Sequence, residues 1–149
     1  MSDEVQRTLE MRARALAAPI AVDARDQGDE VVIFAIGRAR LALASELVRS
    51  VRPLAALAPI PGAPAALAGV ALIEGAPVLV WRLGVVVSAP DPPEAWTRLL
   101  FIGNESTELV VGVTAVEGFV RADFAALNAM GVERIDGRAL IDDPRLRVD

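Results

Sequence analysis

The sequence predicts an all-β fold with minor helices. Hydrophobic residues make up 54% of the 149 residues but aromatic residues only 4%, so a core has to be built from Val, Leu, Ile and Ala. Valines cluster at positions 31–32, 85–87 and 110–111, and β-branched residues favour strands. The apolar runs are short and turn residues separate them, which is typical of β-hairpins.

Residues 1–30 predict an N-terminal helix followed by a linker. Between residues 4 and 16, one narrow stripe at positions i, i+4, i+7 and i+11 holds Val5, Leu9, Arg12-Ala13 and Leu16, and Pro19 ends the helix. Residues 23–30 form a charged linker. So thin a stripe has two interpretations, which are a weakly docked terminal helix and an arm that docks onto a partner helix.

Two apolar runs at 31–36 and 40–44 flank the turn residue Gly37 and predict the first hairpin. Ser45 is a favourable N-cap residue and Glu46 suits a first turn, so we expect a short helix over residues 46–51. Pro53 ends that helix, because the residue before a proline is biased away from the helical conformation.

The stretch from residue 53 to 82 organises the middle of the chain. Its first 21 residues carry no charge, which is long enough for a membrane span. Four prolines and Gly62 would break such a helix, so direct membrane insertion is excluded. We expect a buried hairpin instead, with strands at 67–73 and 77–81 around a Glu74-Gly75 turn.

The second half of the chain also predicts strands. Residues 83–97 contain Pro90, Pro92 and Pro93 and form the one internal boundary. The expected elements after it are strands at 99–102 and 109–113, a strand at 118–121, a helix over 124–130 capped by Asp123, and a closing hairpin of 132–135 and 138–141 around Asp136-Gly137.

Composition excludes several function classes. The chain has 20 acidic and 15 basic residues, for a net charge of −5, so it offers no basic face for nucleic acid. It has no Cys, His or Lys, and therefore lacks the usual catalytic bases and nucleophiles. We expect no enzyme activity and no cofactor; a carboxylate-dependent enzyme using Asp123 or Asp142 is the remaining alternative.

Metal binding and export are not expected either. Asp123, Asp142 and Asp143 lack the dense, alternating oxygen ligands of a calcium loop. The sequence begins with acidic residues where a secretory signal has a basic region. A cytoplasmic location follows as an expectation.

Motifs in and after the central stretch resemble the CheW family of coupling proteins. The motifs are the Pro-Gly-Ala-Pro loop at 61–64, Gly69-Val70 with Glu74-Gly75, the run at 77–84, Arg98-Leu99-Leu100, Val110-Val111-Gly112-Val113, and Gly131-Val132 with Ile135-Asp136-Gly137-Arg138. The resemblance covers residues 31–146 as a single domain. It implies two SH3-like five-stranded β-barrel lobes, lobe one at about 31–83 and a shortened lobe two at about 97–146.

The resemblance also implies a function and a site. Members of the family are non-catalytic chemosensory adaptors that link the cytoplasmic tips of methyl-accepting chemotaxis receptors to CheA-type histidine kinases. Val48, Val51 and Gly69 match the groove that binds the receptor. The alternative for the two valines is that both are core residues.

Five positions depart from the polar signature of the family interface. They are Ser50, Leu72, Glu74, Arg82 and Thr114. Glu74 and Arg82 either pair with partner charges or are solvated turn charges. We expect an adaptor that binds receptor within chemosensory clusters. Its further partner is either the kinase, to which it couples weakly, or another CheW-like protein. The alternatives are an ordinary coupling protein and a small-barrel interaction module outside chemotaxis.

Overall fold

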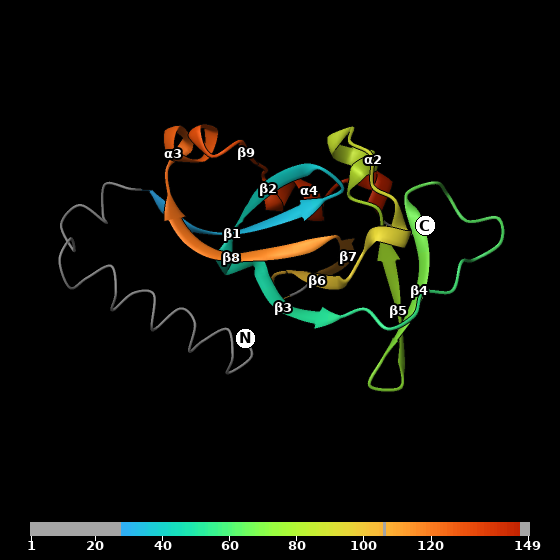
Figure 1. Ribbon diagram of the computed structural model, residues 1–149. Helices are drawn as coiled ribbons and strands as arrows, with labels where there is room; N and C mark the ends of the chain where they lie inside the picture. Colours follow the sequence, from blue (N-terminus) through green and yellow to red (C-terminus); the bar gives the residue numbers. More distant parts are fainter. Residues whose placement is uncertain (1–27, 106, 147–149) are drawn as a thin grey trace.

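The computed structural model describes residues 28–105 and 107–146 (Figure 1). Over these residues the fold is mostly β with a few short helices, which confirms the predicted class. The strands are β1 (Asp29–Ile36), β2 (Ala39–Ala44), β3 (Val48–Pro53), β4 (Leu67–Ile73), β5 (Ala76–Trp81), β6 (Arg98–Gly103), β7 (Glu108–Val113), β8 (Ala115–Ala122) and β9 (Val132–Arg134). The helices are η1 (Ser45–Leu47), α2 (Gly84–Val87), η2 (Pro93–Ala95), α3 (Phe124–Ala129), α4 (Gly137–Ile141) and η3 (Pro144–Leu146).

The strands form two sheets, and each sheet takes strands from both halves of the chain. Sheet A has the order β8-β1-β2-β9, and sheet B has the order β3-β6-β7-β5-β4. The chain therefore starts in sheet A, builds all of sheet B, and returns to sheet A. This corrects the expected division into two consecutive five-stranded lobes, because β1 and β2 pair with β8 and β9 rather than with β3 to β5.

Sheet B curls so that its two edge strands approach each other. The segment after β3 runs beside β4, where Ala58 and Val70 exchange two backbone hydrogen bonds of 2.9 and 2.8 Å. Arg52 at the end of β3 also reaches Glu74 beyond the end of β4, with a nitrogen to oxygen distance of 3.0 Å. These contacts close sheet B into a small five-stranded barrel.

Side chains alternate between two cores along the strands of sheet B, as the period of a strand requires. In β6, Leu100 and Ile102 face the core that lies between the two sheets, while Leu99 and Phe101 face the barrel interior. The core between the sheets is the largest, and we call it the shared core. It includes Val32, Phe34, Leu41, Leu43, Val48, Trp81, Leu83, Val111, Phe119 and Leu140.

The predicted helix over residues 46–51 is wrong. After the single turn of η1 the chain becomes β3, which pairs with β6 from Val48 to Pro53. The Ser45 hydroxyl donates to Glu30 over 3.3 Å instead of capping a helix. Pairing with the buried strand β6 outweighed the weak capping signal, and Pro53 is tolerated because β3 is an edge strand.

The predicted closing hairpin is also wrong. Residues 132–134 form β9, which pairs in parallel with β2, while residues 137–141 form α4. Asp136 is the reason, because its Oδ1 accepts hydrogen bonds from the backbone N–H groups of Arg138 (3.0 Å) and Ala139 (3.3 Å) and so begins a helix.

The segment from residue 83 to 97, which was predicted as the internal boundary, packs against the rest of the domain. Asp91 fixes it, since Oδ1 accepts from the indole N–H of Trp96 (2.6 Å) and Oδ2 accepts from the backbone N–H of Gly84 (3.0 Å). Leu83 is fully buried, and the Trp96 ring lies against Gly112 so closely that a Cβ there would overlap it.

The remaining predicted elements are present. The first, central and β6–β7 hairpins form, and Asp123 caps α3 by accepting from the N–H of Ala126 at 2.8 Å. No helix in the described part of the chain is long and apolar enough to cross a membrane. The predicted helix over residues 4–16 lies outside the described residues.

The central turn gives a direct stability prediction. Glu74 and Gly75 both have positive φ, 52° and 83°, and a Cβ added to Gly75 would meet nothing within 4 Å. Gly75→Val therefore tests backbone strain without a clash, and we expect it to lower the free energy of unfolding by about 1–2 kcal/mol and the Tm by roughly 2–8 °C. Gly75→Asn is the control, because Asn tolerates this conformation. An unchanged Tm for the Val variant would contradict the turn geometry.

Candidate protein-interaction surface

Val48 and Val51, the valines assigned to a receptor-binding groove, lie on β3. Val48 is only 3% exposed and belongs to the shared core, whereas Val51 is half-buried and packs against that core. Ser50 lies between them, half-buried and opposite Phe101 of β6. The alternative of a core residue therefore holds for Val48. Of the two valines, Val51 retains the exposed surface that contact with a partner needs, and its role in a groove stays a prediction.

Gly69, the third residue assigned to the groove, lies on β4 at the opposite edge of sheet B from β3. The ladder order therefore does not make it a neighbour of the two valines. A Cβ at Gly69 would lie 2.3 Å from the carbonyl oxygen of Ala58. The glycine allows the segment after β3 to lie against β4, so its evident contribution is to closure of the barrel.

Two of the residues that depart from the family signature make contacts inside the molecule. Glu74 forms an ion pair with Arg52, with exposed side-chain fractions of 73% and 43%. Arg82 donates from Nη1 to the backbone oxygen of Asp91 over 3.5 Å. An exposed pair of this kind contributes at most about 1 kcal/mol, so the pair adds little to the stability of the barrel.

Thr114 is also used internally, where the chain returns to sheet A. Its hydroxyl oxygen accepts from the N–H of Gly37 at 2.8 Å, and its own N–H donates to Ala35 at 2.8 Å. Thr97 donates its hydroxyl to the Thr114 carbonyl, also at 2.8 Å. Thr114 thereby joins the start of β8 to the first hairpin.

Leu72 differs from these residues because it projects into solvent, with 68% of its side chain exposed. It lies on the β4–β5 hairpin, which extends beyond the rest of the domain (Figure 1). Cross-strand pairing places it beside Pro77, and places Val70 beside Leu79. The opposite side of the hairpin packs into the barrel core. We call the four residues Val70, Leu72, Pro77 and Leu79 the hairpin face.

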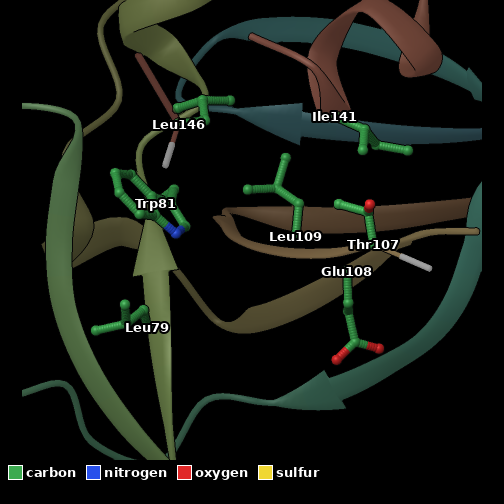
Figure 2. Close-up of a pocket in the computed structure, with 7 residues that line it drawn as sticks. All are labelled: Leu79, Trp81, Thr107, Glu108, Leu109, Ile141 and Leu146. Carbon is green, nitrogen blue, oxygen red and sulfur yellow. The ribbon is translucent and has the colours of Figure 1, made fainter. Parts of the chain in front are cut away.

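An open groove of about 420 Å³ continues from the hairpin face. It is lined by Leu79, Trp81, Thr107, Glu108, Leu109, Ile141 and Leu146. Figure 2 shows Trp81, Leu109 and Leu146 close together, whereas the carboxylate of Glu108 points away from them. We call this the Trp81 groove. Leu79 belongs to both features, so the groove adjoins the hairpin face. The groove's other apolar residues are buried, and its exposed residues besides Leu79 are Thr107 and Glu108.

Sequence reasoning missed the contribution of the C-terminal helices to this groove. Ile141 comes from α4 and Leu146 from η3, where the sequence predicted a strand and its end. The signal was present in Asp136, a favourable N-cap residue ahead of the apolar Leu140-Ile141 pair. Leu79 and Trp81 were predicted as strand residues, but no local pattern indicates what lies against them.

The carboxylates considered for catalysis or metal binding do not converge. Asp123 caps α3, and Asp143 binds Arg145 through a contact of 2.8 Å. Within residues 28–105 and 107–146, no group of three or more His, Cys, Asp or Glu side chains could hold a metal ion.

The best-defined ion pair of the domain crosses sheet A. Arg40 on β2 reaches over β1 to Glu117 on β8 and donates twice to its carboxylate, from Nε at 2.8 Å and from Nη2 at 2.6 Å. Its Nη1 also donates to the carbonyl of Met130 at 2.5 Å. These hydrogen bonds lower the pKa of Glu117 and raise the pKa of Arg40, with a smaller effect of burial in the opposite direction for each.

Comparison with known proteins gives a family and a fold. The sequence model of the CheW-like domain matches residues 30–144. The crystal structure of the scaffolding protein TtCheW from Thermoanaerobacter tengcongensis superposes with a TM-score of 0.54 at 17% sequence identity, covering 66% of this chain and 68% of that one. No curated protein matches the chain. At this identity the structural match shows a shared fold.

The Arg40–Glu117 pair gives a prediction about pH. A carboxyl group whose pKa is lowered on folding contributes stability above its unfolded pKa and loses it as the pH falls through the folded pKa. Between about pH 7 and about pH 3, the wild type should therefore lose more Tm than Glu117→Gln, which does not titrate. Arg40→Met should show the same reduced loss, and combining the two changes should add nothing. Equal losses in all four proteins would contradict the coupling.

Proposed function

The chain belongs to the CheW-like family, and from this we propose that it is a non-catalytic chemosensory adaptor that binds the cytoplasmic tips of methyl-accepting chemotaxis receptors. The family is one of scaffold and adaptor proteins. We place the protein in the cytoplasm, at the chemosensory clusters that it helps to organise. The supporting observations are the family match over residues 30–144 and the two exposed leucines of the hairpin face, Leu72 and Leu79.

Weak coupling to a CheA-type kinase is the second part of the proposal. The family resemblance implies that kinase contact uses strand ends and loops of both lobes and depends on an intact barrel rim. Here the Glu74 carboxylate pairs with Arg52 and the Thr114 hydroxyl accepts from Gly37, so both positions already make a contact within the domain. Leu72 presents an apolar side chain in place of a polar one. Each unmatched polar group at a desolvated contact costs about 1–3 kcal/mol, and about 1.4 kcal/mol corresponds to a factor of ten in Kd.

The role that results is like that of FrzB, the second CheW-like protein of the Frz chemosensory system. An adaptor of this kind binds receptor and meets the kinase weakly, or through another CheW-like protein. An apolar contact surface suits such a domain-to-domain contact, because protein interfaces have apolar, charge-depleted centres.

Two alternatives lead to different results in binding experiments. An ordinary coupling protein would bind both receptor and kinase, if its kinase has changed to match Leu72 and Glu74. A small-barrel interaction module outside chemotaxis would bind neither of them. The polar positions that are used internally favour the weakly coupled adaptor over the first alternative.

Receptor binding is tested at β3. We expect Val51→Asp to raise the Kd for a cognate receptor tip about tenfold or more, because a charge replaces half-buried apolar surface at the proposed contact. Val85→Asp on α2 is the control, since Val85 is 37% exposed and lies outside the proposed groove. Val48→Asp should instead unfold the domain, because it buries a charge in the shared core. Unchanged receptor affinity in a folded Val51→Asp protein would contradict the proposed groove.

Kinase coupling is tested by titrating the cognate kinase regulatory domain into the full chain by calorimetry. We expect a Kd weaker than about 100 μM. Two polar mismatches would weaken a complex that otherwise has a micromolar Kd to this value or beyond. Leu72→Asn, which restores the residue typical of the family, should tighten binding, while Leu72→Ser at the same exposed site should do so less. A wild-type Kd in the low micromolar range would contradict weak coupling and favour the ordinary coupling protein.

A further inference from the structure

A second open groove, of about 500 Å³, lies on the side of the domain where β1 begins. It is lined by Asp29, Ala44, Glu46, Leu47, Phe124, Arg134, Ile135, Asp136, Gly137 and Arg138. A smaller hollow of about 240 Å³ adjoins it through shared residues and adds Glu30 and Ser45. These linings come from the start of β1, the end of β2, η1, α3, β9 and the first turn of α4. We call this surface the β1 groove.

The β1 groove has an apolar interior with one unusually exposed member. Phe124 at the start of α3 is 68% exposed, although the rest of that helix is anchored by the fully buried Leu127. Phe124 lines the groove together with Leu47, Ala44 and Ile135. An aromatic side chain this exposed contributes large apolar area to any contact that covers it.

The charges around the β1 groove are mainly acidic. Its linings carry four carboxylates, from Asp29, Glu30, Glu46 and Asp136, against the two guanidinium groups of Arg134 and Arg138. Arg134 is already paired with Asp29, at 3.5 Å. The groove therefore suits an occupant that combines apolar side chains with positive charge.

Such an occupant is present in the same chain. Between residues 4 and 16 the sequence places the apolar side chains Val5, Leu9 and Leu16 on one helical stripe, and Arg12 lies on the same stripe between Leu9 and Leu16. A helix of this length spans about 20 Å. The 27 residues that precede Gly28 join β1 at Asp29, which itself lines the groove.

We propose that residues 4–16 dock into the β1 groove of their own chain, with Val5, Leu9 and Leu16 covering Phe124 and with Arg12, on the same stripe, near Glu46 and Glu30. The intervening residues 17–28 reach up to about 40 Å when extended. This length is enough to bring residues 4–16 to the groove, because Asp29, which follows them, lines it. Tethering of this kind gives effective concentrations on the order of millimolar. A short helix is marginal alone in water, so its formation is coupled to docking. This surface is separate from the hairpin face and does not depend on the partner assignment.

Hydrogen exchange of the full chain tests the proposal. We expect the backbone amides of residues 4–16 to be protected in the wild type and to exchange about tenfold faster in Phe124→Ser. Leu72→Ser is the matched control. Leu72 is also 68% exposed, but it lies on the β4–β5 hairpin of sheet B and does not line the β1 groove. Absence of protection in the wild type, or equal protection in both variants, would overturn the proposal.

Cysteine cross-linking identifies the occupant even if a serine variant proves unstable. The chain contains no cysteine, so Leu9→Cys with Phe124→Cys leaves one possible pair within a molecule. We expect an intramolecular disulfide in the monomer under mild oxidation, and little with Leu9→Cys and Leu72→Cys. Disulfide-linked dimers as the main product would mean that a second copy occupies the groove. That result, or no cross-link at all, would contradict docking within one chain.

Discussion

The shared core between the two sheets is the constraint on which the rest of the structure depends, because neither sheet buries both of its faces alone. Phe34 and Leu43 come from sheet A, and Trp81 and Val111 from sheet B, yet all four pack into one apolar cluster. The chain passes between the sheets twice, after Ala44 and again at Thr114. Surfaces on one sheet are therefore held in a fixed relation to surfaces on the other, as an adaptor that contacts more than one partner requires.

Closure of the barrel in sheet B explains why the family's polar signature could change without loss of the fold. Glu74 takes Arg52 as its partner across the two edges of the sheet, and Gly69 allows the backbone at Ala58 to approach β4. What remains exposed at the end of this hairpin is Leu72. The barrel thus keeps its fold with an exposed apolar side chain at the end of this hairpin.

The strands could be predicted from the sequence because alternation and turn chemistry are local. Two such local signals are Gly75, which has a positive φ in the turn between β4 and β5, and Asp123, which caps α3. Residues 46–51 could not, since their conformation depends on pairing with β6. Residues 137–141 carried a local signal in the capping carboxylate of Asp136, but the same Asp136-Gly137 pair also suits a hairpin turn. The order of strands in the sheets rests on pairings such as that of β1 with β8, which leave no local signal. For the same reason Val48 could be assigned to either a groove or the core, and only its burial decided between them.

The most direct test of this account is residue-resolved hydrogen exchange in increasing urea, comparing β1 of sheet A with β7 of sheet B. If the shared core makes the two sheets one cooperative unit, the slowest amides of both strands should exchange with the same free energy of opening and the same dependence on urea. If β1 opens at a distinctly lower free energy while β7 stays protected, the sheets are separate units and the central claim is wrong.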